Sequence, residues 1–184
     1  MSSKNWDIKK DIEQGDWSLF LDRDGVINRR IVDDYVKSWE DFEFLPGVLP
    51  SFPIFAKKFK HIFIVTNQQG VGKGLMTKEA VNTVHQKMKS HIEATGCKID
   101  GIYFCPALAA EQNPCRKPNI GMAQQAKAEF PDVDFAKSIM VGDSPSDIEF
   151  GINAKMKTVF IGNRQLKLTP DAHFDHLIDF AKTL

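Results

Sequence analysis

Two carboxylates stand directly after a short apolar run near the beginning of the chain. Residues 18–21, Ser-Leu-Phe-Leu, are followed by Asp22 and Asp24, with Gly25 next. An apolar run of this length is typical of a buried strand. Two acids that are two residues apart project to the same side of an extended chain, where they repel each other unless a cation lies between them. The spacing therefore indicates a divalent-cation site, with two solvated turn aspartates as the alternative.

Polar residues of distinct chemical types follow the other apolar runs as well. In a parallel sheet, the carboxyl ends of the strands face one crevice. Acids for a divalent cation, a hydroxyl, an amide and a basic pair are the groups needed to hold and transfer a phosphoryl group. The residues that the later strand ends and their loops supply are Thr66, Asn67, Arg116, Lys117, Asp143 and Asp147.

The elements that must position these residues alternate along the chain. Alternation of apolar runs with helical segments predicts an α/β fold, a doubly wound (Rossmann-like) parallel sheet with helices on both faces. The predicted strands are 18–21, 62–65, 99–104, 138–141 and 158–161, and the predicted helices are 48–59, 77–95 with Thr77 as N-cap, 119–129 and 145–154. An amphipathic segment at 173–183 closes the chain.

The chain divides at residue 17 in this interpretation. Residues 1–16 are polar and of mixed charge, which predicts an N-terminal extension with one short helix, and residues 17–184 form a single domain. Residues 29–46 show no period and are expected to form an irregular loop. A loop this long is usually functional, and its aromatic residues are expected to pack it onto the body of the domain: Tyr35, Trp39, Phe42 and Phe44.

Composition narrows the classes of function. Lys plus Arg and Asp plus Glu both number 24, so the net charge of zero supports neither a nucleic-acid partner nor a membrane surface. No apolar run approaches the ~20 residues of a membrane span, and the N-terminal residues lack the apolar core of a signal peptide. Three cysteines, an odd number, argue against a closed disulfide framework and favour a reducing cytoplasm.

Four ordered motifs carry a resemblance to a known family. They read Asp-Arg-Asp-Gly-Val-Ile-Asn, Val-Thr-Asn-Gln, Cys-Arg-Lys-Pro and Val-Gly-Asp-Ser-Pro-Ser-Asp. In this order they resemble the motifs of the haloacid dehalogenase (HAD) superfamily of phosphohydrolases. The longer forms, Phe-Glu-Phe-Leu-Pro-Gly-Val and Cys-Arg-Lys-Pro-Asn-Ile-Gly-Met among them, resemble the branch that holds heptose-bisphosphate and histidinol-phosphate phosphatases. The resemblance implies a HAD-like domain and, because no sizeable segment separates the motifs, no large cap domain.

The resemblance also implies roles for the strand-end residues. Asp22 would attack phosphorus to form an aspartyl-phosphate, and Asp24 would protonate the leaving oxygen and then activate water. Asp22, the Asp24 backbone carbonyl and Asp143 would hold Mg²⁺. The phosphoryl group and substrate would be bound by Thr66, Asn67, Gln68, Arg116 and Lys117.

Two of these residues have a competing explanation. Ser144-Pro145-Ser146-Asp147 has the form of a capping box, so Asp147 is expected to cap a helix or support Lys117 rather than bind the metal directly. A surface position is a close alternative for Gln68.

The loop at residues 105–118 bears on a second metal. Related enzymes commonly carry a structural zinc site of the form Cys-x-His and Cys-x-Cys at this place. Here the corresponding residues are Cys105, Ala107, Asn113 and Cys115. A structural zinc site normally needs four ligands and only two remain, so no zinc is expected. Pro106, Pro114 and local packing are expected to order the loop instead.

Together these inferences predict a Mg²⁺-dependent phosphomonoesterase, a cytoplasmic monomer that acts on a small phosphorylated metabolite. Within the branch that it resembles, a sugar phosphate such as heptose 1,7-bisphosphate is the first substrate expected. Histidinol phosphate is the alternative, supported by the short cysteine loop. Two further hypotheses remain open: a phosphotransferase, and a phosphate-binding module without catalysis.

Overall fold

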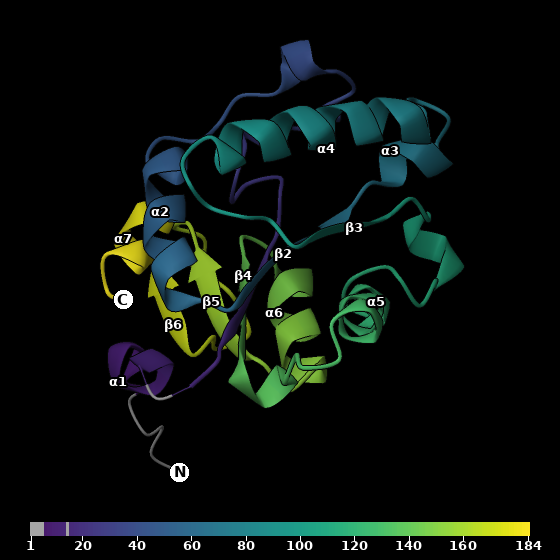
Figure 1. The fold of residues 1–184 in the computed structure, drawn as a ribbon. Helices are drawn as coiled ribbons and strands as arrows, with labels where there is room; N and C mark the ends of the chain where they lie inside the picture. The colour runs from purple at the N-terminus through teal and green to yellow at the C-terminus, as the bar shows by residue number, and fades with distance from the viewer. Residues whose placement is uncertain (1–5, 14) are drawn as a thin grey trace.

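A six-stranded parallel sheet organises the chain in a computed structural model that describes residues 6–13 and 15–184. The strand order is β3-β2-β1-β4-β5-β6, so β1 lies in the interior of the sheet (Figure 1). The predicted doubly wound α/β fold is confirmed. The strands are β1 (Ser18–Leu21), β2 (His61–Asn67), β3 (Gly101–Cys105), β4 (Ser138–Gly142), β5 (Lys157–Ile161) and β6 (Ala172–Phe174).

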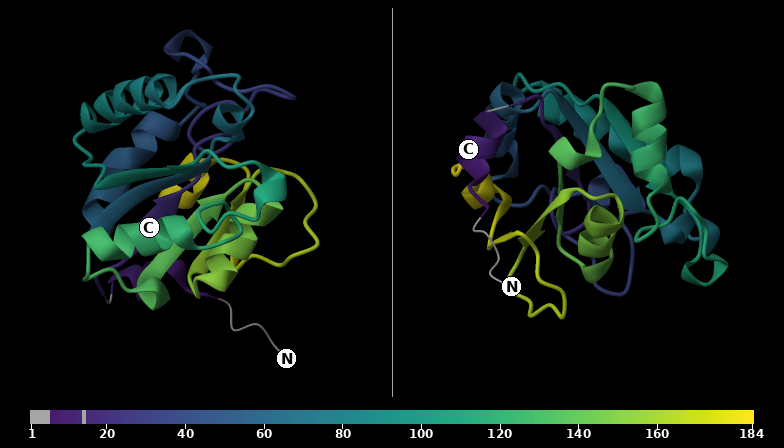
Figure 2. Two further views of the ribbon diagram at one scale, coloured as in Figure 1. Left: turned by 90° about the vertical axis from the view of Figure 1, so that its right-hand side faces the viewer. Right: turned by 90° about the horizontal axis from the view of Figure 1, so that it is seen from below.

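Helices cover both faces of the sheet. Figure 2 shows α2 and α4 on one side of the sheet and α5 and α6 on the other. The helices are α1 (Ile8–Glu13), α2 (Val48–Lys58), α3 (Gln69–Gly72), α4 (Lys78–Glu93), α5 (Gly121–Glu129), α6 (Pro145–Asn153) and α7 (Leu177–Ala181), with short 3₁₀ turns η1 (Trp39–Asp41), η2 (Ala109–Glu111) and η3 (Phe135–Lys137). No helix of the described residues is both long enough and apolar enough to span a membrane.

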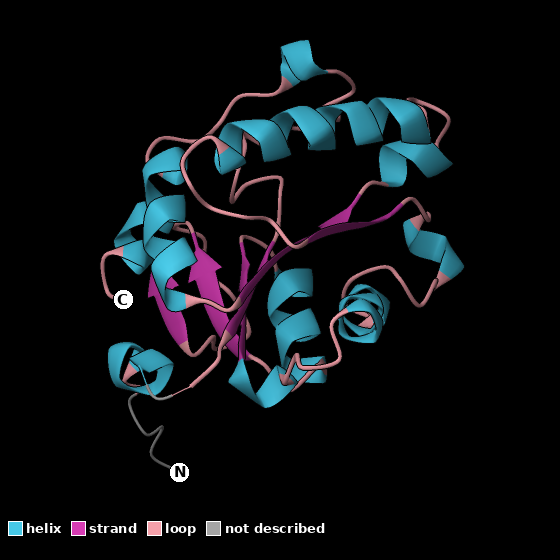
Figure 3. Ribbon diagram, viewed as in Figure 1, coloured by secondary structure: helices cyan, strands magenta, loops and turns pink. Residues whose placement is uncertain are grey.

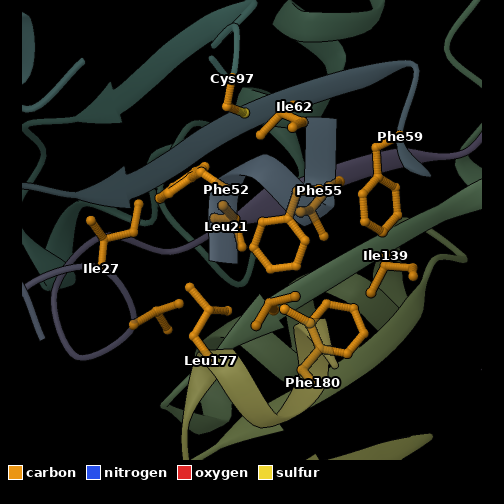
Figure 4. Packing of buried hydrophobic residues seen from close by; sticks show 14 of the residues in the cluster. Leu21, Ile27, Phe52, Phe55, Phe59, Ile62, Cys97, Ile139, Leu177 and Phe180 are labelled. Atoms are coloured by element: carbon orange, nitrogen blue, oxygen red, sulfur yellow. The ribbon is translucent and has the colours of Figure 1, made fainter. Parts of the chain in front are cut away.

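The pleat of β1 divides the core into two clusters. All four residues of β1 are buried, and successive side chains of a strand point to opposite faces. Leu19 and Leu21 accordingly lie in one cluster with residues of α2 and α7, whereas Phe20 lies in the other with residues of α5 and α6. Figure 4 shows the first cluster, in which Phe55 and Phe180 pack side by side with their ring centroids 5.8 Å apart. Burial on both faces explains why β1 is apolar throughout.

The register of the sheet places the end of β1 beside the end of β4, and three residues before the end of β2. Leu21, the last residue of β1, is paired with Ile64 of β2 and with Val141 of β4. The next residue, Asp22, still donates its backbone N–H to the Val141 carbonyl at 2.9 Å. The strand order reverses direction between β1 and β4, which is where ligands bind in open α/β sheets. The side chains that follow β1 and β4 therefore face a shared crevice.

The capping prediction for α4 is confirmed, and one boundary prediction is corrected. Thr77 caps α4, because its side-chain oxygen accepts the backbone N–H of Ala80 at 3.1 Å. The residues Thr66 and Asn67 were expected to follow a strand, but they are the last two residues of β2, paired with Phe104 and Cys105 of β3.

The amphipathic segment 173–183 divides into a strand and a helix. Residues Ala172–Phe174 form β6, paired with β5, and only Leu177–Ala181 is helical. Asp171 explains the difference: its carboxylate accepts the backbone N–H of Thr158 at 2.9 Å and the Thr158 hydroxyl at 3.0 Å. This contact holds the segment against β5 before any helix begins.

The N-terminal segment forms the short helix α1 within the described residues. Ile12 of α1 is buried in the first core cluster, and Trp17 donates its indole N–H to the Asp11 carbonyl at 2.8 Å. Residues 1–5 and 14 of the predicted extension lie outside the described residues. The division between an extension and a domain at residue 17 stays a prediction.

The loop at residues 29–46 is irregular apart from η1, the short helical turn at the top of Figure 3. Trp39 stacks on Phe42 with the ring centroids 4.9 Å apart, and it also lies 4.9 Å from the His91 ring of α4. Three of the four predicted aromatic residues thus anchor the loop, since Phe44 joins this group. Tyr35 differs, because its hydroxyl accepts a hydrogen bond from Gln69 at 3.0 Å. The loop therefore spans from α4 to the crevice.

Candidate active site

A cavity of about 310 Å³ opens at the carboxyl ends of β1 and β2. Seven of the nine predicted site residues line its wall, and the 29–46 loop contributes Arg30 and Tyr35. Gln68 and Asp143 lie directly behind this wall, in contact with wall residues. The seven predicted residues in the wall are Asp22, Asp24, Thr66, Asn67, Arg116, Lys117 and Asp147.

A buried lysine joins two aspartates at the floor of the cavity. The Lys117 Nζ atom lies 2.7 Å from Asp22 Oδ1 and 2.6 Å from Asp147 Oδ1, and it donates to the Val65 carbonyl at 2.8 Å. The three charged residues are 3%, 4% and 1% exposed, respectively. Burial alone would lower the pKa of Lys117, but the charges of Asp147 and Asp22 outweigh it and raise that pKa. The lysine is therefore a fixed positive charge beside Asp22.

Asp147 also caps α6, as the capping-box spacing predicts. Its Oδ2 accepts the backbone N–H of Ser144 at 3.0 Å and the Ser144 hydroxyl at 2.6 Å. Both oxygens of Asp147 are thus engaged, one by the cap and the other by Lys117. The two explanations weighed for this residue, capping and support for Lys117, are realised together.

Three carboxylates converge beside Lys117 and form what we call the acid cluster: Asp22, Asp143 and Asp147. Each offers one oxygen such that the three oxygens lie within 4.8 Å of one another. Burial, followed by the charge of Asp147, raises the pKa of Asp22 to about 7 despite the opposing charge of Lys117. Burial likewise raises the pKa of Asp143 to about 6, although the Arg30 charge opposes the shift. Lys117 and Arg30 together carry less charge than the three carboxylates, so a divalent cation fits the site.

A glycine permits the close approach of the segments that follow β1 and β4. Gly25 has a φ of +96°, and a Cβ atom there would lie 2.0 Å from Asp143 Oδ2. Only a residue without a side chain fits both the left-handed backbone and the contact. The spacing Asp-x-Asp-Gly is thereby explained by the placement of Asp143.

Asp24 is held in a different way from Asp22. Its carboxylate accepts from Arg23 Nη2, Asn28 Nδ2 and Gln68 Nε2, each at 2.9 Å. Burial would raise the pKa of Asp24, but the charge and hydrogen bond of Arg23, together with the two amides, lower it. The two acids of the opening motif therefore differ: the pKa of Asp22 is raised and that of Asp24 is lowered.

The predicted substrate contacts divide into two groups. Thr66 and Arg116 lie in the cavity wall, and Arg116 donates to the Ala107 carbonyl at 3.2 Å. Asn67 accepts the backbone N–H of Lys117 at 3.0 Å and donates to its carbonyl at 3.2 Å, which fixes the start of the Lys117 side chain. The surface position considered for Gln68 is wrong, because it is 1% exposed and donates to Asp24 and Thr66.

Residues that the sequence interpretation missed surround Asp24 and Asp143. Arg23 is fully buried, and its Nη1 atom lies 3.0 Å from His85 Nε2 of α4. Burial lowers the pKa of His85 to about 3. The imidazole is therefore neutral and accepts the hydrogen bond from Arg23. Arg23 and Asn28 lie inside the first motif, which was the available signal. Arg30 lies in the irregular loop, where no pattern marks it.

The cysteine prediction is corrected by the structure. Cys105 and Cys115 form a disulfide, and Cys97 is the buried cysteine left over. An odd count excludes only complete pairing, because it leaves room for one pair and one free thiol. In this state the two sulfurs are bonded to each other and neither is a thiolate ligand for zinc. The disulfide ties the end of β3 to the residue before Arg116, whereas the sequence predicted that Pro106, Pro114 and local packing would order the loop.

The raised pKa of Asp143 makes a prediction for the metal-free protein. Between pH 4 and 6 the folded protein holds a proton on Asp143 that the unfolded chain, with a pKa of 3.8, releases. The unfolded state then binds fewer protons, so this group lowers stability as pH rises through that window. We expect Asp143→Asn to match wild type near pH 4 and to exceed it by up to about 3 kcal/mol at pH 8. Urea unfolding in EDTA measures this difference, and a difference that is constant with pH contradicts the prediction.

Comparisons with known proteins agree with this geometry. The family model described as polynucleotide kinase 3 phosphatase matches residues 19–181, which include all the strand ends of the acid cluster. The chain is 41% identical over 170 residues to a D-glycero-alpha-D-manno-heptose-1,7-bisphosphate 7-phosphatase of Mycobacterium tuberculosis, covering 90% of each chain. It is 33% identical over 171 residues to a D-glycero-beta-D-manno-heptose-1,7-bisphosphate 7-phosphatase of Helicobacter pylori, covering 90% of this chain and 97% of the relative.

A solved structure is similar over nearly the whole fold. It is the crystal structure of a D,D-heptose 1,7-bisphosphate phosphatase from B. bronchiseptica complexed with magnesium and phosphate. The match has a TM-score of 0.82 and 30% sequence identity, and it covers 90% of this chain and 96% of the other.

Proposed function

The chain belongs to the haloacid dehalogenase superfamily of phosphatases, in the branch of the heptose-bisphosphate phosphatases, and on this premise we propose that Asp22 is its catalytic nucleophile. Asp22 Oδ1 is held by Lys117 at 2.7 Å at the floor of the cavity. A carboxylate at a strand end beside a fixed cation attacks phosphorus, and the phosphorus–oxygen bond to the substrate breaks as the aspartyl-phosphate forms. Lys117 offsets the charge that the transferred group brings into the buried site.

Asp24 is the proton-transfer group in this proposal. Its lowered pKa favours the ionised form, which accepts a proton from the water that hydrolyses the aspartyl-phosphate. Donation of a proton to the leaving oxygen in the first half-reaction requires the protonated form. The donors Arg23, Asn28 and Gln68 oppose that form. Asp24 Oδ2 accepts from Gln68 alone among these donors, so this oxygen keeps a lone pair for the proton.

Mg²⁺ is the cofactor that fits the site. Its protein ligands would be Asp22, Asp143 and the backbone carbonyl of Asp24, while Asp147 remains with Lys117 and the helix cap. Oxygen ligands of this kind suit Mg²⁺, which keeps several waters and needs few protein ligands. When bound, the ion neutralises charge on the phosphoryl oxygens and so favours attack by a carboxylate.

The substrate that we propose is a heptose 1,7-bisphosphate, hydrolysed at one of its two phosphates. Support comes from the relatives, which are named for the alpha anomer in one case and the beta anomer in another. Arg116 and Arg30 add positive charge to the wall, Tyr35 adds a hydroxyl, and Thr66 adds a donor for a phosphoryl oxygen. Asn67 and Gln68 position Lys117 and Asp24, respectively, so their contribution to substrate binding is indirect in this proposal.

The observation that carries the proposal is the buried contact of Asp22 with Lys117 next to the acid cluster. Phosphate release from both anomers of heptose 1,7-bisphosphate, from histidinol phosphate and from p-nitrophenyl phosphate tests it, with Mg²⁺ or EDTA. We expect Mg²⁺-dependent release with the highest kcat/KM for one heptose anomer, and ³¹P NMR identifies which phosphate leaves. Histidinol phosphate as the best substrate would support the alternative, and no release from any compound would support a non-catalytic phosphate-binding module. Transfer of the phosphoryl group to an added alcohol rather than water would indicate a phosphotransferase.

Three sequence-based expectations stay predictions. They are a cytoplasmic location, a monomeric state, and the absence of nucleic-acid and membrane partners. Gel filtration with light scattering measures the oligomeric state of the full chain.

A further inference from the structure

One arginine from the 29–46 loop reaches into the acid cluster. The Nη2 atom of Arg30 donates to Asp143 Oδ1 at 2.7 Å and to the Asp24 backbone carbonyl at 3.1 Å. The Asp143 side chain is 11% exposed and that of Arg30 is 37% exposed, and the Arg30 guanidinium points from the loop toward the acid cluster. A single nitrogen therefore bridges two oxygens that come from different strand ends.

These two oxygens belong to the residues assigned above to Mg²⁺, and the inference rests on that proposed function. A divalent cation held by the Asp143 carboxylate and the Asp24 backbone carbonyl would need groups that the Arg30 guanidinium also contacts. The Arg30 Nη2 atom donates to both of these groups at hydrogen-bond distance. The arginine and such a cation would therefore compete for the same two groups.

The negative charges of the acid cluster favour the position of the Arg30 guanidinium beside Asp143. Asp22, Asp143 and Asp147 are all buried, and Lys117 contacts only Asp22 and Asp147 among them. Asp143 is left with Arg30 as its ion-pair partner among the described residues. A buried carboxylate without a cation is costly, so Arg30 stabilises the cluster whenever no metal is bound.

We propose that Arg30 occupies the divalent-cation position in the metal-free protein and must leave it when the cation binds. The guanidinium stands in for the missing positive charge and competes with Mg²⁺ for the same oxygens. Arg30 also lines the cavity, so once displaced it remains beside the substrate-binding space with its charge free to face an anionic group. Metal loading and the conformation of the 29–46 loop are thereby coupled.

The opposite role for Arg30 would be to orient Asp143 for the metal. That role makes the arginine help metal binding, whereas the proposed role makes it compete. The two differ in the sign of one measurable quantity, the change in Mg²⁺ affinity when the arginine is removed.

Isothermal titration of the metal-free full chain with Mg²⁺ measures this sign without any catalytic turnover. We expect Arg30→Ala to bind Mg²⁺ about three- to thirtyfold more tightly than wild type, because the competing charge is gone. Arg29→Ala is the matched control: Arg29 is the neighbouring residue, carries the same charge and pairs with the exposed Glu43 at 2.9 Å. Its removal is expected to change the affinity less than twofold, about the size of an unspecific charge effect.

Thermal unfolding gives a second readout. In EDTA, Arg30→Ala is expected to have a lower Tm than wild type, because Asp143 loses its partner. In saturating Mg²⁺ the deficit should disappear, since the ion then occupies the position in both proteins. Arg29→Ala should show no such dependence on the metal.

The outcomes separate this inference from the proposed function. If wild type does not bind Mg²⁺ at all, or if Asp143→Asn binds it as tightly as wild type, the assigned metal site is wrong and so is the inference. If wild type binds Mg²⁺ through Asp143 but Arg30→Ala binds it equally or more weakly, only the competition by Arg30 is overturned.

Discussion

Replacing Asp22 with asparagine is expected to lower kcat/KM for p-nitrophenyl phosphate by at least about 10⁴-fold in saturating Mg²⁺. An amide in this position has nearly the same shape but cannot attack phosphorus, so the covalent step is lost. The fold should persist, because Lys117 keeps its contact with Asp147 at 2.6 Å and with the Val65 carbonyl at 2.8 Å. Steady-state kinetics and circular dichroism of the same preparation measure both expectations.

A surface aspartate provides the control for this substitution. Asp16 pairs with Lys60 at 2.9 Å and its side chain is 76% exposed, so Asp16→Asn should retain wild-type turnover. Acid quenching followed by mass spectrometry should place a phosphoryl group on the peptide that contains Asp22 in wild type and not in Asp22→Asn. Retention of turnover within tenfold of wild type by Asp22→Asn would rule out this residue as the nucleophile.

Replacing Lys117 with methionine is expected to lower the free energy of unfolding by about 3 to 5 kcal/mol in the metal-free protein. Methionine fills a similar volume but leaves Asp22 and Asp147 as buried carboxylates without their cation. Activity should also fall by several orders of magnitude, because no other described side-chain cation lies within 4 Å of Asp22. Urea unfolding in EDTA measures the stability.

Lys98→Met is the matched control for the lysine. Lys98 lies 2.8 Å from Asp100, which is as close as the buried pair, but its side chain is 78% exposed. Water screens the exposed Lys98, and Asp100 keeps the Ile62 backbone N–H as a partner at 3.0 Å, so Lys98→Met should lower the free energy of unfolding far less than Lys117→Met. The double variant Lys117→Met/Asp147→Asn should regain part of the stability without activity, because one unpaired charge has been removed. An equal loss in Lys117→Met and Lys98→Met would contradict the assigned role of burial.

Much of the fold and the floor of the site could be predicted from the sequence. The β1 strand is apolar on both faces because the sheet is covered on both sides, and polar residues at its end are therefore conspicuous. The same argument located Thr66, Lys117 and Asp143 correctly at one crevice. These predictions succeeded because a buried parallel strand is recognisable in the sequence as a short apolar run. The carboxyl ends of such strands lie at one edge of the sheet, so residues far apart in the sequence can be placed together.

The remaining features depend on contacts between distant residues that leave no local pattern. The three-residue strand β6 depends on the hydrogen bond that the Asp171 carboxylate accepts from the Thr158 backbone N–H. The disulfide between Cys105 and Cys115 follows from the return of the loop to the end of β3. Arg30 reaches Asp143 only because the irregular loop folds back over the crevice. Spacing and periodicity carry no information on any of these contacts.

The central position of β1 also governs the order in which the site can form during folding. Ser18 pairs with His61 on one side and with Ser138 on the other, so β1 is translated long before its second neighbour. Strands that are this far apart in the sequence pair slowly. Until they have paired, the open edge of β1 can associate with other chains. Asp22 is thus made together with β1, while Asp143 arrives with the strand that closes this edge. The pairing of β4 with β1 therefore does two things at once: it covers the open edge of β1, and it brings Asp143 into the acid cluster.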